Sequence, residues 1–244
     1  MVGDPKTPVE RGKSGTVEQK SSRSEIDAFV AKARTMSSAK AAGARGRLIF
    51  ALDATMSRQP TWDTACKLQA DMFNETAQIG GLDVQLMYFR GFDECRASRW
   101  VSDPKALANL MTRIDCRGGH TQIRRVLAHT RDETRKKAVQ ALVYIRDCME
   151  ESVDDLCAVA GEIGLTGARV FMFHEGRDAI AEKAFREIAR LTNGAYCRFD
   201  TGSAQHLREL LAAVAVYAAG GRAALADYGK KRRGQAQLLL EQLR

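Results

Sequence analysis

The chain has 244 residues, of which 45% are hydrophobic and 28% charged, so it can bury the core of one large domain or two small ones. No run approaches the roughly 18 apolar residues that a membrane-spanning helix needs, which predicts that no segment spans a membrane. The formal net charge of +8 is unevenly placed: residues 1–47 carry +5 and residues 220–244 carry +4, which leaves −1 for residues 48–219. The basic excess therefore belongs to the two ends of the chain.

Cellular location is indicated by the cysteines and by the first residues. The six cysteines are scattered without a CxxC pair, which argues against a zinc site and is typical of reduced thiols. The first residues lack the apolar segment of a secretory signal. We therefore expect a cytoplasmic protein.

The first 46 residues are predicted to precede the domain. Residues 1–23 are polar and rich in Lys, Ser and Gly, and a segment of that composition cannot offset its ordering entropy, which predicts a disordered basic tail. Residues 24–46 begin with Ser24 before an acidic first turn, which predicts a short capped helix followed by a Gly/Arg linker.

Residues 47–219 alternate between short apolar runs and amphipathic stretches. The expected strands are residues 48–52, 84–89, 95–101, 139–145, 168–173 and 196–199. The expected helices are residues 61–79, 153–163, 178–191 and 207–217, with two more that begin at Pro104 and at Thr121. Strands that alternate with helices form crossover units. The sequence thus predicts an α/β fold with a doubly wound, mostly parallel sheet and helices on both faces.

Residues 220–244 are expected to form a basic extension. The run Lys230-Lys231-Arg232-Arg233 precedes a leucine-rich stretch from Leu238 to Leu243. This stretch predicts a short helix that either docks on the domain or is offered to a partner.

The first expected strand is followed directly by Asp53-Ala54-Thr55-Met56-Ser57. A carboxylate and two hydroxyls at alternate positions can face one point from a tight loop. They are hard oxygen ligands, which suit Mg²⁺ or Mn²⁺ rather than zinc. A turn in which Asp53 caps the following segment is the simpler interpretation.

Two further oxygen side chains are expected at the same edge of the sheet. Thr121 follows Gly118-Gly119-His120 at an expected helix start, and Asp147 follows the expected strand 139–145. Each has a simple structural interpretation, Thr121 as an N-cap and Asp147 as a turn carboxylate. Ligands of open α/β sheets bind beyond the carboxyl ends of the strands, where all three features fall.

Together these motifs resemble the von Willebrand factor A (VWA) family and its metal-ion-dependent adhesion site, over about residues 47–219. The resemblance implies a Rossmann-like fold and a divalent cation, Mg²⁺ or Mn²⁺. It also implies a non-enzymatic interaction module, in which an Asp or Glu carboxylate of an unidentified protein partner completes the metal shell. The implied metal ligands are Asp53, Thr55, Ser57, Thr121 and Asp147.

The sequence departs from the family pattern beside the site. Thr55 replaces the usual first serine, and Cys148 stands where glycine is frequent. Arg58 and Arg146 place positive charge next to the expected ion, which weakens cation binding unless the arginines are paired or point away.

Two other functions remain open. The basic ends could bind nucleic acid, with the domain as a scaffold. A phosphatase-like hydrolase is less favoured, because Thr55 stands where a D-x-D-x-T enzyme has its second aspartate and no phosphate-binding glycine loop is present. His174-Glu175-Gly176 is expected to be a turn at the rim, His120 a loop residue, and Trp62 a cap on the core.

Overall fold

The computed structural model describes residues 45–199, 204–232 and 235–243. The tail predicted at 1–23, and all but the last two residues of the segment predicted at 24–46, lie outside these ranges. The described strands are β1 (Gly46–Asp53), β2 (Leu82–Arg90), β3 (Glu94–Val101), β4 (Ala141–Arg146), β5 (Arg169–Glu175) and β6 (Ala195–Phe199). The described helices are α2 (Gln59–Thr76), α3 (Pro104–Met111), α4 (Ile123–Lys136), α5 (Val153–Thr166), α6 (Ala179–Leu191), α7 (Ala204–Lys231) and α8 (Gln235–Gln242), with 3-10 turns η1 (Met56–Arg58) and η2 (Ala77–Ile79).

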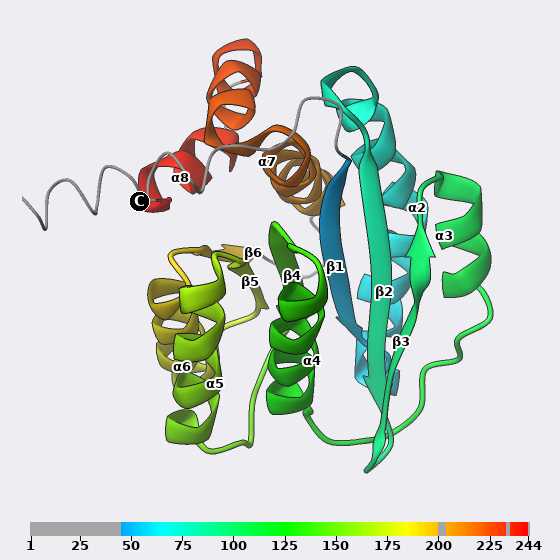
Figure 1. Ribbon diagram of the computed structural model, residues 1–244. Coiled ribbons are helices and arrows are strands. Elements are labelled where there is room, and N and C mark those ends of the chain that lie inside the picture. The colour runs from blue at the N-terminus through cyan, green and yellow to red at the C-terminus, as the bar shows by residue number, and fades with distance from the viewer. Residues whose placement is uncertain (1–44, 200–203, 233–234, 244) are drawn as a thin grey trace, which may run out of the picture. The chain divides into compact units, whose positions relative to one another are not determined.

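The six strands form one sheet in the order β3-β2-β1-β4-β5-β6 (Figure 1). All neighbouring pairs are parallel except β2 and β3, which form an antiparallel hairpin. The chain passes from β1 to β2 on one side and later to β4 on the other, so the strand order reverses at β1. In such sheets, ligands usually bind beyond the carboxyl ends of the strands at this reversal, here β1 and β4.

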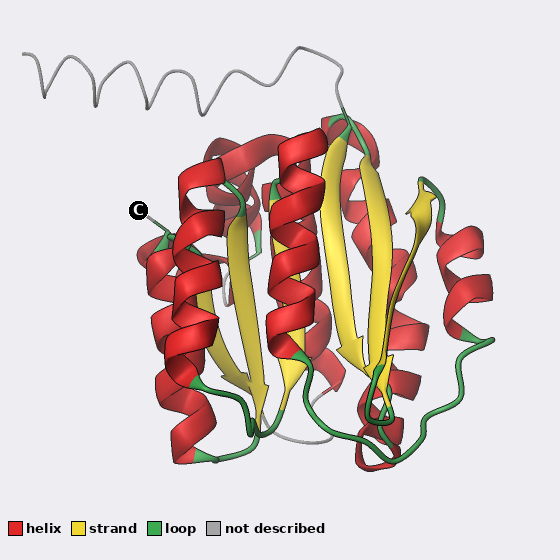
Figure 2. Cartoon of the chain, turned by 60° about the horizontal axis from the view of Figure 1, so that its bottom comes forward, coloured by secondary structure: helices red, strands yellow, loops and turns green. Residues whose placement is uncertain are grey.

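Helices cover both faces of the sheet, which confirms the predicted doubly wound α/β class (Figure 2). One face packs against α2, α3, α7 and α8, and the other against α4, α5 and α6. The alternation along β1 shows why: Leu48, Phe50 and Leu52 enter the first core, whereas Ile49 and Ala51 enter the second. A strand buried on both faces must be apolar at every position, as this run is.

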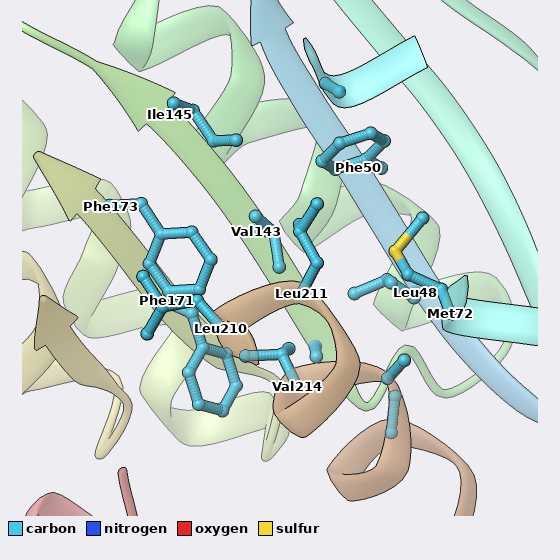
Figure 3. Close-up of a cluster of buried hydrophobic side chains, with 14 of the residues drawn as sticks. Leu48, Phe50, Met72, Val143, Ile145, Phe171, Phe173, Leu210, Leu211 and Val214 are labelled. Carbon is cyan, nitrogen blue, oxygen red and sulfur yellow. The ribbon is translucent and has the colours of Figure 1, made fainter. Parts of the chain in front are cut away.

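Helix α7 fills the centre of the first core. Leu210, Leu211 and Val214 lie against Val143 of β4 and Phe171 of β5 (Figure 3). Among the described helices, α7 is the one long and apolar enough to cross a membrane by length and composition, yet 56% of that stretch is buried inside the domain. Its apolar composition is therefore also that of a core helix.

The C-terminal extension returns to the domain. The backbone breaks its helical course inside α7 at Gly221, where φ is 71° and ψ is −165°. Beyond the break, Leu225, Ala236, Leu239 and Leu243 are buried in the same core as the sheet. Of the two arrangements that the leucine-rich stretch allows, the described residues adopt the docked one.

Two predicted boundaries at the carboxyl edge are wrong, and the helix predicted at 207–217 extends over Ala204–Lys231 with a break at Gly221. His174 and Glu175 are not a rim turn. They belong to β5 and are buried, because β6 continues to pair with them, and the strand ends only at Gly176, where φ is 102°. Helix α4 begins at Ile123 rather than Thr121, because Glu151 accepts the backbone N–H groups of Ile123 and Arg124 and so caps the helix.

Candidate functional site

The site begins in the loop that leaves β1. Asp53 is 2% exposed at the end of the strand, and Oδ1 accepts a hydrogen bond from the backbone N of Thr55 at 2.8 Å. Thr55 Oγ1 donates to Asp53 Oδ2 at 2.8 Å and lies 3.3 Å from Ser57 Oγ. The tight loop thus brings the carboxylate and both hydroxyls together, as the spacing predicts.

The guanidinium of Arg146 lies next to this loop. Arg146 is the last residue of β4, its side chain is 5% exposed, and Nη1 contacts Asp53 Oδ2 directly. Nε lies 3.4 Å from Asp147 Oδ1 and donates to the backbone O of Cys148 at 3.2 Å. Nη2 lies 3.9 Å from Glu150 Oε1. One buried cation therefore links the β1 loop to the segment after β4.

Thr121 reaches this group through Glu150. Its Oγ1 donates to Glu150 Oε2 at 2.6 Å, and its backbone N donates to the same oxygen at 3.2 Å. Although partial burial raises the pKa of Glu150, the hydrogen bonds from Thr121 outweigh it and hold the pKa below its ordinary value. The ionised carboxylate therefore stays available to the nearby Arg146.

A second arginine closes the other side of the site. Arg58 Nη1 donates to Glu175 Oε2 at 2.6 Å, and Nη2 lies 3.3 Å from Asp147 Oδ2. Thr61 Oγ1 also donates to Glu175 Oε2, at 2.5 Å. Asp147 is thus held between the two arginines, and η1, α2, β4 and β5 are tied together at one edge.

Sequence reasoning therefore placed all five residues at one edge, but it did not foresee what joins them. Thr55 contacts both Asp53 and Ser57 directly, whereas Asp147 and Thr121 join them through Arg146 and Glu150. The missed residues are Glu150 and the roles of Arg58 and Arg146. The available signal was the charge rule: an arginine next to a buried strand needs carboxylate partners, but this rule does not tell which of the nearby acidic residues provides them.

In this arrangement, the carboxylate of Asp53 has no free oxygen to offer a metal ion. Both carboxylate oxygens of Asp53 are already engaged, Oδ1 by the backbone of Thr55 and Oδ2 by Thr55 Oγ1 and Arg146. A cation bound to Asp53 and Thr55 would lie against a buried guanidinium and be repelled by it. Among the described residues, no group of three or more His, Cys, Asp or Glu side chains could hold a metal. Metal binding by the five residues stays a prediction.

Three exposed apolar side chains follow strands that end at the same edge of the sheet. Met56 follows β1 and is 70% exposed, Phe92 follows β2 and is 77% exposed, and Ile180 follows β5 and is 66% exposed. His120, in the loop before α4, contacts Phe92 with ring centroids 5.1 Å apart. A large apolar side chain is therefore exposed to solvent after each of three strands: in η1, in the loop after β2 and in the first turn of α6.

No family model and no curated protein matches this sequence. Solved structures of low sequence identity share its fold. The SpRpn10 VWA domain is 12% identical, with a TM-score of 0.53, over 72% of this chain and 98% of that domain. An aerotolerance-related membrane protein from Bacteroides fragilis is 19% identical, with a TM-score of 0.51, over 68% of this chain and 96% of that one.

A third neighbour carries a metal. Proximal thread matrix protein 1 from the mussel byssus, with a zinc-occupied MIDAS motif, is 16% identical, with a TM-score of 0.55, over 70% of this chain and 45% of that one. At these identities the likeness concerns the fold alone. The chain has a VWA-like, doubly wound α/β fold.

Proposed function

We propose that this chain is a non-enzymatic protein-interaction module that binds its partner at the carboxyl edge of the sheet, around Asp53 and Arg146. The observation that carries this proposal is the exposure of Met56, Phe92 and Ile180, which follow three different strands at that edge. Large apolar side chains gathered around a polar centre are typical of interaction sites, where a partner covers them and excludes water.

The charges at this edge favour an acidic group on the partner. Arg117 is exposed and its loop is joined to the β1 loop, since Arg117 N donates to the backbone O of Ala54 at 2.9 Å. Arg124 is exposed in the first turn of α4. Neither side chain has an ion-pair partner within the described ranges. Asp154 and Asp155 lie at the start of α5, so the partner's carboxylate is expected on the β1 side, away from them.

The sequence predicts that this carboxylate completes the shell of a Mg²⁺ or Mn²⁺ ion. The arrangement around Arg146 favours the same binding surface, but there the positive charge that attracts the partner's carboxylate comes from arginines rather than from a metal ion. Arg117 and Arg124 offer a partner's Asp or Glu the planar, multiply donating group that suits a carboxylate.

The basic C-terminal run gives less support to nucleic-acid binding. Arg232 forms an ion pair with Glu75 of α2 at 2.9 Å, and Lys230 pairs with Asp227 at 3.0 Å. Carboxylates of this chain therefore already neutralise part of the charge that would attract phosphates.

Capture experiments test the proposed surface. The immobilised full chain is exposed to lysate from its source cells, and the bound proteins are compared for wild type, Phe92→Ser and Leu165→Ser. Leu165 is the matched control: it is 91% exposed but ends α5, at the opposite edge of the sheet. We expect a captured protein to be lost with Phe92→Ser and kept with Leu165→Ser. Equal capture by all three proteins would remove this edge from the proposal.

A further inference from the structure

The five side chains predicted to hold a metal ion surround the guanidinium of Arg146. Arg146 Nη1 contacts Asp53, which in turn binds Thr55 and, through it, Ser57. Its Nε faces Asp147, and its Nη2 faces Glu150, which holds Thr121. Asp53 and Asp147 therefore face Arg146 directly, and Thr55, Ser57 and Thr121 are linked to it through one or two other side chains.

Arg146 is fixed in this position by the fold. It ends β4 in register with His174 of β5, beside the strand that carries Asp53. Its side chain is 5% exposed and its Cζ lies 5.8 Å from the ring centroid of Phe89. His174 Nε2 lies 2.9 Å from the backbone O of Asp147, which fixes the segment that follows. The guanidinium is thus positioned by packing as well as by charge.

We infer that Arg146 is the resident cation of this site and takes the place of a divalent metal ion. A guanidinium stays protonated at every physiological pH, presents five N–H donors in one plane and pairs with several carboxylates. It pairs with Asp53 and lies near Asp147 and Glu150 without an exogenous ion, and its charge repels one. The wild-type site therefore needs no divalent metal to neutralise Asp53. This inference concerns the cation alone and does not depend on the proposed partner.

Removal of the guanidinium should expose a latent metal site. In Arg146→Ala, the oxygen atoms of Asp53, Thr55 and Ser57 lose their buried cation, whereas Asp147 keeps Arg58 as a partner. A small divalent ion suits the hard oxygen ligands left in the β1 loop. The full-length chain and its variants are titrated with Mn²⁺ alone, and bound Mn²⁺ is followed by its paramagnetic resonance signal. We expect the wild type to bind Mn²⁺ too weakly to detect, and Arg146→Ala to bind it with a dissociation constant at least about tenfold below the highest Mn²⁺ concentration tested.

Matched variants separate this effect from loss of folding. Arg47→Ala removes another buried arginine, which pairs with Glu133 at the amino end of β1, and should bind no Mn²⁺. Asp53→Asn combined with Arg146→Ala should lose the gained binding. If Arg146→Ala does not fold, Arg146→Met preserves the packing on Phe89 and serves in its place. Mn²⁺ binding by wild type that Asp53→Asn abolishes would overturn the inference, as would a folded Arg146 variant that gains no Mn²⁺.

Discussion

Glu175 has a carboxylate at the end of β5 whose side chain is 2% exposed, and Arg58 is its charged partner. Replacement of Arg58 by alanine would leave this carboxylate buried with only the hydroxyl of Thr61. Loss of one partner of a buried pair costs roughly 3 kcal/mol or more, since the remaining charge is no longer compensated. We expect Arg58→Ala to lower the free energy of unfolding by about that amount in urea denaturation.

A surface pair provides the control for this prediction. Arg131 pairs with Glu162 at 3.1 Å, and both side chains are partly in solvent, so Arg131→Ala should cost less than about 1 kcal/mol. The double variant Arg58→Met, Glu175→Met should recover stability, because apolar side chains of similar size need no charge partner. An equal, small loss for Arg58→Ala and Arg131→Ala would show that the Arg58–Glu175 pair is not a buried one in solution.

At the level of single residues, the sequence predicted which side chains gather but not how they are joined. The spacing of Asp53, Thr55 and Ser57 limits them to one tight loop, so their contact followed from local geometry. The sequence shows that Arg146 is a positive neighbour of the site. It does not show which carboxylates its side chain faces, because a long side chain reaches whichever ones the tertiary fold places nearby. Glu150 is unmarked in the sequence, and only the packing of the α4 and α5 starts brings it to Thr121.

Two glycines join the loops that carry Phe92 and Thr121. Gly91 and Gly119 form a parallel bridge, with Gly91 N donating to Gly118 O at 2.9 Å and His120 N donating to Gly91 O at 3.1 Å. A Cβ on Gly119 would overlap the backbone of Gly91, whereas one on Gly118 would meet nothing within 4 Å. The close approach therefore requires glycine at 119 and not at 118.

We expect Gly119→Ala to separate these two loops. The overlap is with backbone, which cannot rotate away, so the cost should be about 2 kcal/mol and Tm should fall by several degrees. Gly118→Ala should leave Tm nearly unchanged. The comparison is made by thermal denaturation followed by circular dichroism. An equal Tm for the two variants would contradict the close packing of these loops.

Most helices and strands could be predicted from the sequence. The errors at the carboxyl edge concern element ends that are set by contacts between residues far apart in the sequence. Apolar runs such as 48–52 and the amphipathic stretch 178–191 carry their own periodicity, which does not depend on neighbours. The start of α4 and the end of β5 depend on Glu151 and on pairing with β6, which no local pattern reveals. Both errors lie at the carboxyl edge, where strands end among charged side chains.

At the scale of the whole molecule, the buried core and the exposed apolar side chains lie in different parts of the described fold. Helices α7 and α8 bury their apolar side chains in the core on one face of the sheet. The loops after β1, β2 and β5 carry instead the exposed Met56, Phe92 and Ile180. A rigid sheet that presents variable loops at one edge is a common way to build a binding surface.

The central claim is that a partner docks on this edge without a divalent metal. The most direct measurement is site-specific crosslinking in lysate of the source cells. A photoreactive side chain is placed at position 56 or, as control, at position 165, and the lysate is used with and without a chelator. We predict a crosslinked partner from position 56 under both conditions and none from position 165. Crosslinking from position 165 alone would place the interaction elsewhere, and crosslinking from position 56 that the chelator abolishes would show that a metal ion, not Arg146, completes the site.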